Sequence, residues 1–226
     1  MSRGIFIVGT GTDIGKTYIT ALINKKLLED NINATYYKAV LSGAEYNGES
    51  VICDASVVLN KQLSSSEAKK HISYIMKTPA SPHLASKIEG VNISLTKIKE
   101  DFNALLSEYD YITVEGSGGV VCPIVIGDRV ILLEDIIRDL NLKTILVADA
   151  GLGTINSTVL TVHYMKDKGI EVKGIILNNY NCENIIHRDN VDVIEKLTGI
   201  KIIDLVERNG NINLSSEELI SYYGKV

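Results

Sequence analysis

The 226-residue sequence has few cysteines and no long apolar run. Its three cysteines, Cys53, Cys122 and Cys182, are odd in number and form no Cys-x-x-Cys pair, which argues against a disulfide framework and a zinc site. The first apolar run, residues 5–8, is too short for a signal-peptide core, and no later stretch reaches a membrane-spanning length. We therefore expect a soluble, cytoplasmic protein without a membrane partner.

An excess of positive charge is also missing. The formal net charge is -5 and the pI is near 5.4, which argues against binding nucleic acid or anionic lipid through the overall field. Any bound anion must then be held by local groups. With 45% hydrophobic residues, the chain suits one α/β domain over residues 1–226 and is short for two typical domains.

Short apolar runs rich in β-branched residues alternate with amphipathic segments. The continuous runs are typical of buried parallel strands and predict strands at residues 4–8, 35–40, 111–115, 144–148, 172–177 and 201–205. Apolar residues three and four positions apart predict helices at 16–30, 94–107, 132–140, 156–168 and 184–197. Polar stretches at 43–50, 61–66 and 208–216 are predicted to be loops. The repeated strand–helix order predicts a doubly wound, mostly parallel sheet with ligands at the carboxyl ends of its strands.

A phosphate-binding loop is indicated after the first strand, where residues 9–17 read Gly-Thr-Gly-Thr-Asp-Ile-Gly-Lys-Thr. A tight glycine loop that enters a helix directs backbone N–H groups and the helix dipole at a phosphate. Lys16, taken as an exposed loop residue, is expected to reach the β and γ phosphates, and Thr17 to bind Mg²⁺. The motif is imperfect, because five residues separate its outer glycines and Thr10 replaces the first glycine. The Gly-Lys-Thr ending still predicts a P-loop NTPase; the alternative is a glycine-rich turn with a solvated lysine.

Two carboxylates are candidates for the Mg²⁺ site, since this hard cation is usually held by one or two carboxylates with phosphate oxygens and water. Glu115 ends a predicted strand and precedes Gly-Ser-Gly-Gly at residues 116–119, a loop that can approach a phosphate or substrate closely. A glutamate that caps a loop is the alternative. Asp54 precedes an apolar helix and, by itself, is more typical of an N-cap.

Lys38 lies inside the apolar run of residues 36–40. A buried lysine needs a compensating anion, and beside a nucleotide loop that anion is predicted to be a transferring phosphoryl group. The alternative is a lysine at an exposed sheet edge.

Together these residues resemble the dethiobiotin synthetases. The likeness runs from the first strand to about Asn179 and consists of residues 9–17, 37–43, Asp54, 78–83, 114–119 and 151–156. Its most specific parts are Lys-x-x-x-Ser-Gly at 38–43 and Ser-Pro-His at 81–83, which together favour this family over other P-loop ATPases.

The resemblance implies an ATP-dependent ligase of biotin biosynthesis. One amine of 7,8-diaminopelargonate takes up CO₂ as a carbamate, ATP phosphorylates the carbamate, and the second amine attacks the mixed anhydride. The ureido ring of dethiobiotin closes, with release of ADP and phosphate. In this chain the resemblance assigns stabilisation of the transferring phosphoryl and carbamate charges to Lys16 and Lys38, and Mg²⁺ to Thr17, Asp54 and Glu115.

The resemblance also implies binding residues and a homodimer. The implied nucleotide-binding residues are Asp13, Ile14, Gly15, Lys16, Thr17, Tyr18, Asp54, Glu115, Gly116, Ser117, Gly118, Asn178 and Asn179. The implied substrate-binding residues are Thr12, Ser42, Gly151, Leu152, Gly153, Thr154 and Asn156. The glycine-rich turn at 151–156 opens a predicted helix, whose N-terminus suits an anion. In the family this turn holds the substrate carboxylate for the partner subunit's site.

Two departures from the family lie on the side of the nucleotide base. Asn179 stands where many relatives have aspartate, and Glu207 where they have proline. The preference for adenine over other bases therefore stays open. The Ser-Pro-His turn at 81–83 is expected to shape the site rather than to transfer protons.

Two other classes of protein stay open. An amide-forming ligase of the corrinoid type shares this style of loop, but it resembles the chain less at Lys38 and at the Ser-Pro-His block, and no residues remain for its glutaminase domain. A partitioning or switch ATPase is expected to carry a second lysine early in the loop, where this chain has Thr10 and Gly11.

Overall fold

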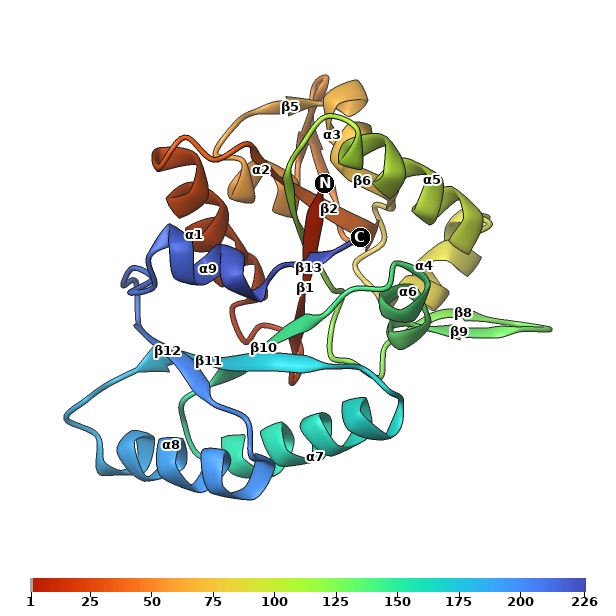
Figure 1. The fold of residues 1–226 in the computed structure, drawn as a ribbon. Coiled ribbons are helices and arrows are strands. Elements are labelled where there is room, and N and C mark those ends of the chain that lie inside the picture. The colour runs from red at the N-terminus through yellow and green to blue at the C-terminus, as the bar shows by residue number, and fades with distance from the viewer. Residues whose placement is uncertain (1) are drawn as a thin grey trace.

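The computed structural model describes residues 2–226 and is built around an eight-stranded sheet (Figure 1). The strand order is β12-β11-β10-β1-β7-β2-β6, and β13 pairs with β1. All neighbours in this order are parallel, whereas β13 is antiparallel to β1. Small antiparallel sheets are formed by β3-β4-β5 and by β8-β9. The α/β fold with a mostly parallel sheet is thus confirmed.

The elements follow one another in a mostly alternating order. They are β1 (Arg3–Gly9), α1 (Lys16–Glu29), β2 (Ala34–Leu41), β3 (Glu45–Asn47), β4 (Ser50–Ile52), α2 (Asp54–Val58), β5 (Leu63–Ser64), α3 (Ser65–His71), β6 (Ile72–Ile75), α4 (Pro82–Glu89), α5 (Leu95–Leu106), β7 (Tyr111–Glu115), β8 (Pro123–Ile126), β9 (Val130–Leu132), α6 (Leu133–Asp139), β10 (Thr144–Asp149), α7 (Thr154–Asp167), β11 (Val172–Tyr180), α8 (Ile185–Thr198), β12 (Ile202–Glu207), α9 (Ser216–Tyr222) and β13 (Gly224–Lys225).

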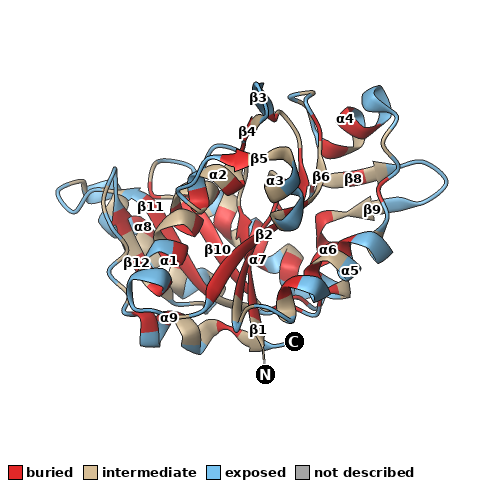
Figure 2. Ribbon diagram, turned by 90° about the horizontal axis from the view of Figure 1, so that it is seen from above, coloured by how far each residue is buried: buried red, intermediate tan, exposed pale blue. Residues whose placement is uncertain are grey.

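Helices cover both faces of the sheet, which explains why the central strands are apolar throughout. All eight residues of β2 are buried, and Figure 2 shows the buried strands between helices whose outer sides are exposed. One core cluster joins the strands to α5, α6, α7 and α8, and a second joins the opposite face to α1 and α9. A third cluster packs α2 and α3 beside β2. Parallel strands need such two-sided cover because each strand is linked to the next by a crossover.

The six predicted strands and five predicted helices are present, with ends that differ by at most three residues. All three loop predictions are wrong in part, the third only at Ser216, the first residue of α9. Residues 43–50 contain β3 and the first residue of β4, and residues 61–66 contain β5 and the start of α3. The sequence patterns also did not predict β6, α4, the β8–β9 hairpin, α9 or β13, since elements this short carry too few residues to show a period. No helix in residues 2–226 has the length and apolar content needed to cross a bilayer.

Candidate active site

The segment of residues 9–17 contains the last residue of β1, the loop of residues 10–15 and the first two residues of α1, so the predicted strand–loop–helix order is confirmed. Gly15 occupies the N-cap of α1 with φ 96°, a left-handed conformation that favours glycine. A Cβ at this position would lie 2.0 Å from Asn178 Nδ2. That Nδ2 atom donates a hydrogen bond to Ile14 O at 3.0 Å. Asn178, near the end of β11, therefore anchors the loop through its side-chain amide. Only glycine at position 15 leaves room for that amide.

Lys16 is the first residue of α1 and is 7% exposed, so the expectation of an exposed loop residue is wrong. Its aliphatic stem packs against Gly9, where a Cβ would lie 2.8 Å from Lys16 Cδ. Its Nζ donates to Gly11 O at 2.7 Å. Burial, followed by the nearby Lys38 ammonium, lowers the pKa of Lys16. An incoming phosphate would favour the charged form of this lysine.

Lys38 forms ion pairs with two carboxylates. Strand register places it opposite Glu115, and its Nζ lies 2.8 Å from Glu115 Oε1 and also contacts Asp54 Oδ2. Burial lowers the pKa of Lys38, but Glu115 and Asp54 outweigh it, so the net pKa is raised and the side chain is a cation. The predicted burial of Lys38 beside an anion is confirmed, but the anions in the structure are the Asp54 and Glu115 carboxylates, and the phosphoryl group stays a prediction. The sheet-edge alternative is wrong, because β2 lies between β7 and β6.

Three oxygen-bearing side chains meet around Lys38. Thr17 Oγ1 donates to Glu115 Oε1 at 2.8 Å, and Asp54 shares Lys38 Nζ with Glu115. Asp54 is the first residue of α2, and Cys53 holds the N-cap, so the N-cap interpretation of Asp54 is wrong. Hydroxyl and carboxylate oxygens are the ligands that suit Mg²⁺. A cluster of three or more His, Cys, Asp or Glu able to hold a metal is absent from the described residues.

These groups line a cleft of about 440 Å³ at the carboxyl ends of β1, β2 and β7. Its lining residues are Thr12, Asp13, Gly15, Lys16, Thr17, Lys38, Leu41, Ser42, Asp54, Glu115, Ser117 and Gly118. All but Leu41 were predicted as site residues, and Leu41 ends β2 immediately before Ser42. Ile14, Tyr18 and Gly116 do not line the cleft, although their chain neighbours do.

Comparisons with known proteins agree with this geometry. A family model described as an AAA domain matches residues 3–214. A protein of Clostridium botulinum (strain Loch Maree) called ATP-dependent dethiobiotin synthetase is 50% identical over 227 residues, which cover 100% of both chains. A protein of the same name from Clostridium perfringens is 51% identical over 92% of each chain. The chain belongs to the dethiobiotin synthetase family. The resemblance inferred from the sequence blocks is thereby confirmed.

Solved structures of other proteins share the fold of this dethiobiotin synthetase family member. A ParA family ATPase from Chlorobium tepidum matches with a TM-score of 0.60 and 19% identity, over 92% of this chain and 86% of that one. The septum site-determining protein MinD from Pyrococcus horikoshii matches with a TM-score of 0.57 and 17% identity, over 92% and 82%. At these identities the likeness concerns the fold alone, and the partitioning ATPase alternative receives no support from it.

Pro79, two residues before the Ser-Pro-His block at 81–83, packs against the loop that follows β2. A Cβ on Gly43, the residue after Ser42, would lie 3.4 Å from Pro79 Cα. Backbone hydrogen bonds between Met76 and the end of β2 hold the segments together. The exposed Ser81 Oγ and the half-buried His83 Nδ1 are 3.0 Å apart. Ser81, Pro82 and His83 do not line the cleft themselves, so their role in shaping the site stays a prediction.

The turn after β10 is held by two polar residues that the sequence reading missed. Asp149 accepts hydrogen bonds from Asn179 Nδ2 at 2.7 Å and from Gly151 N at 2.8 Å. The buried Asn190 of α8 donates from Nδ2 to Ala150 O at 2.9 Å. Asp149 directly follows a predicted strand, and residues at this position lie at the carboxyl edge of the sheet, where ligands bind. The sequence therefore offered a signal for Asp149. Asn190 carries no such signal, because it lies inside a helix.

The five predicted substrate residues of this turn do not line the cleft of their own chain. They are Gly151, Leu152, Gly153, Thr154 and Asn156. Leu152 is 92% exposed, an unusual position for a large apolar side chain. Within one chain, therefore, the structure does not bring this turn to the P-loop cleft.

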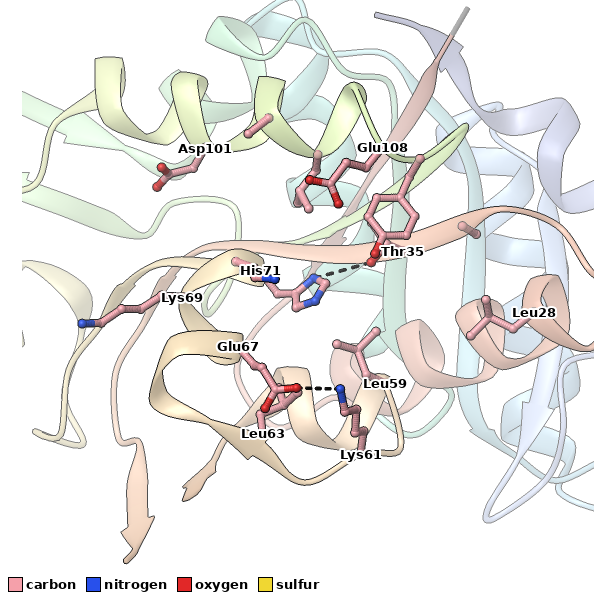
Figure 3. A pocket seen from close by; sticks show the side chains of 15 residues that line it. Leu28, Thr35, Leu59, Lys61, Leu63, Glu67, Lys69, His71, Asp101 and Glu108 are labelled. Atoms are coloured by element: carbon pink, nitrogen blue, oxygen red, sulfur yellow. Dashed lines mark hydrogen bonds and ion pairs between the residues drawn. The ribbon is translucent and has the colours of Figure 1, made fainter. Parts of the chain in front are cut away.

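A second cavity of about 510 Å³ lies near the amino end of β2, at the opposite edge of the sheet (Figure 3). Thr35 and His71 line it, together with Lys61 and Glu67, which pair at 2.7 Å. Burial lowers the pKa of His71. The cavity is larger than the P-loop cleft, but it is lined by none of the predicted site residues. The cleft with convergent charged groups is therefore the candidate active site.

Proposed function

We propose that this protein forms dethiobiotin from 7,8-diaminopelargonate, CO₂ and ATP, with release of ADP and phosphate. The observation that carries the proposal is the convergence of Lys16, Lys38, Thr17, Asp54 and Glu115 at one cleft. A carbamate oxygen attacks the γ-phosphorus of ATP, ADP leaves, and the second amine then attacks the carbamate carbon and expels phosphate. Phosphoryl transfer needs positioning and charge stabilisation more than covalent chemistry by the protein, and this cleft is built for those tasks.

Each charged group has a role in this proposal. Thr17, Asp54 and Glu115 hold Mg²⁺, which neutralises charge on the phosphates when bound. Lys16 Nζ gives up its hydrogen bond to Gly11 O and donates to phosphate oxygens instead. In the structure, Asp54 and Glu115 also hold Lys38. When these carboxylates bind a cation, their hold on Lys38 weakens, and its ammonium group can donate to the carbamate and the transferring phosphoryl group.

The remaining predicted contacts extend from the cleft to the nucleotide base and the diamine. We assign nucleotide contacts to Asp13, Ile14, Gly15, Tyr18, Gly116, Ser117, Gly118, Asn178 and Asn179, and diamine contacts to Thr12 and Ser42. Asn178 Oδ1 is buried without a hydrogen-bond partner among residues 2–226, which suits an acceptor for a base amino group. All three cysteines lie within the described residues and are free thiols, which supports a protein that works in the cytoplasm. One central sheet that begins with β1 and ends with β13 supports a single domain over residues 1–226.

A turnover assay tests the reaction. Phosphate release is expected to require both diaminopelargonate and bicarbonate, and mass spectrometry is expected to detect dethiobiotin. Lys16→Ala is expected to abolish turnover, whereas Lys25→Ala, on the same helix with a side chain 62% exposed, retains it. Phosphate release that needs neither substrate, or that DNA or lipid stimulates, would contradict the proposed reaction.

We also propose a homodimer in which the turn at 151–156 binds the substrate carboxylate for the partner's cleft. The turn opens the 14-residue helix α7 and leaves Leu152 exposed, so it offers N–H donors and an apolar contact to a second copy.

Mixing two inactive variants tests the shared site. Lys16→Ala damages the P-loop, and Gly153→Glu damages the turn. In a heterodimer, the P-loop of the Gly153→Glu chain and the turn of the Lys16→Ala chain form one intact site, and the other site carries both defects. Random exchange makes half of the dimers heterodimers, so about a quarter of wild-type activity is expected. Proven heterodimers without activity would contradict the shared site.

A further inference from the structure

The two carboxylate oxygens of Glu115 have different surroundings. Oε1 accepts hydrogen bonds from Lys38 Nζ at 2.8 Å and from Thr17 Oγ1 at 2.8 Å, and both donors line the cleft. Oε2 accepts a hydrogen bond from Tyr36 OH at 3.2 Å. Tyr36 does not line the cleft. One oxygen therefore faces the groups assigned to chemistry, and the other is held from within the protein.

Strand geometry explains how Tyr36 reaches this carboxylate. Tyr36 and Lys38 are two positions apart on β2 and so project from the same face of the sheet. In the β2–β7 register, Lys38 lies opposite Glu115 and Tyr36 opposite Thr113. The Tyr36 side chain thus leaves β2 two residues before Lys38, farther from the carboxyl ends of the strands. Its hydroxyl approaches the Glu115 carboxylate from that side.

Packing fixes the Tyr36 ring in one place. The residue is 0% exposed and belongs to the core cluster that joins β2 to α2 and α3. Cys53, Ala55 and Val58 are buried in the same cluster, and Asp54 lies on the turn of α2 that they anchor. A ring confined in this way holds its hydroxyl at a defined point, as a donor that orients a metal-binding carboxylate must.

We propose that Tyr36 is a positioning residue for the reaction: its hydroxyl fixes the rotation of the Glu115 carboxylate so that Oε1 faces the cleft. Glu115 is 2% exposed, so water does not replace a lost donor at Oε2 at low cost. Without the hydroxyl, the carboxylate can turn and divide its two oxygens differently between Thr17, Lys38 and the cation. The inference rests on the proposed role of Glu115 as a Mg²⁺ ligand.

The chain offers a matched control for a single-atom deletion. Tyr37 is the next residue on β2, is also 0% exposed, and has a hydroxyl bonded to Ser73 Oγ at 2.6 Å and Ile98 O at 2.9 Å. It projects from the opposite face, into a different core cluster. Tyr36→Phe and Tyr37→Phe therefore remove the same group from equally buried sites, and only the first touches Glu115.

Mn²⁺ is the probe, because its electron paramagnetic resonance signal reports binding without turnover. In the presence of ADP, Tyr36→Phe is expected to weaken Mn²⁺ binding about tenfold, and Tyr37→Phe to leave it within twofold of wild type. In turnover assays, the Mg²⁺ concentration for half-maximal activity is expected to rise for Tyr36→Phe alone, with kcat recovered at saturating Mg²⁺. ADP affinity measured in EDTA is expected to be unchanged.

Different outcomes overturn different statements. Wild-type Mn²⁺ affinity in Tyr36→Phe, or equal losses in both variants, would refute the positioning role and leave the proposed reaction standing. Failure of the wild-type protein to bind Mn²⁺ with ADP would instead refute the metal role of the cleft. Urea unfolding of the same samples verifies the fold. If Tyr36→Phe does not fold, site-specific incorporation of 3-fluorotyrosine, which keeps the hydroxyl and makes it more acidic, supplies the second test. The label at position 36 is expected to change the Mn²⁺ affinity, because that hydroxyl contacts Glu115, and the label at position 37 is expected to leave it unchanged. Equal effects at the two positions would refute the positioning role.

Discussion

Replacing Lys38 by Met removes the ammonium group and keeps an unbranched side chain. Without nucleotide or metal, Asp54 and Glu115 then share a partly buried site with no cation between them. Breaking a buried ion pair by removing one partner costs about 3–5 kcal/mol. The lower end applies here, because the Asp54 side chain is 29% exposed. At about 2–4 °C per kcal/mol for a chain of this size, the melting temperature is expected to fall by about 6–12 °C.

The same substitution is expected to remove catalysis. A cation about 4 Å from a developing charge contributes roughly 4 kcal/mol at an effective dielectric of about 20, which corresponds to about a thousandfold in rate. The Mg²⁺–ADP complex is expected to raise the melting temperature of Lys38→Met more than that of wild type, since the metal replaces the missing charge between the carboxylates. Calorimetry in EDTA and in Mg²⁺–ADP measures stability, and phosphate release with diamine and bicarbonate measures rate. Wild-type melting in EDTA, or turnover within tenfold of wild type, would refute this reasoning.

Further substitutions and labelling examine the loop and the thiols. Gly15→Ala is expected to abolish ADP binding, because its Cβ would lie 2.0 Å from Asn178 Nδ2. Gly48→Ala is the control, since Gly48 also has a positive φ but an added Cβ would meet nothing within 4 Å. Equal ADP affinities of the two variants in titration calorimetry would contradict this prediction. Burial raises the pKa of Cys122 to about 11, so about one thiol in a thousand is ionised at pH 8, and iodoacetamide is expected to modify the exposed Cys182 first. Peptide mass spectrometry checks this order, and labelling of Cys122 as fast as Cys182 would contradict its burial.

Long elements were predictable from the sequence because burial on both faces leaves a continuous apolar run. β7 begins and ends where the apolar pattern predicts it, and α1 ends within one residue of its prediction. The hairpin of β3 and β4 was not predictable, since its strands have three residues each. They depend on pairing with each other more than on local preference.

The sequence by itself determined the family and the strand–loop–helix unit in which phosphate binding is predicted. A strand, a glycine-rich turn and a helix that begins with Lys16 follow one another in the chain, so a short stretch of sequence is enough to predict them. Tertiary structure decided the rest. Lys38 and Glu115 are 77 positions apart and meet because β2 and β7 are adjacent, and Tyr36 reaches the second oxygen of the same carboxylate through that register. Strand order results from how helices pack on both faces of the sheet, which no short stretch of sequence specifies.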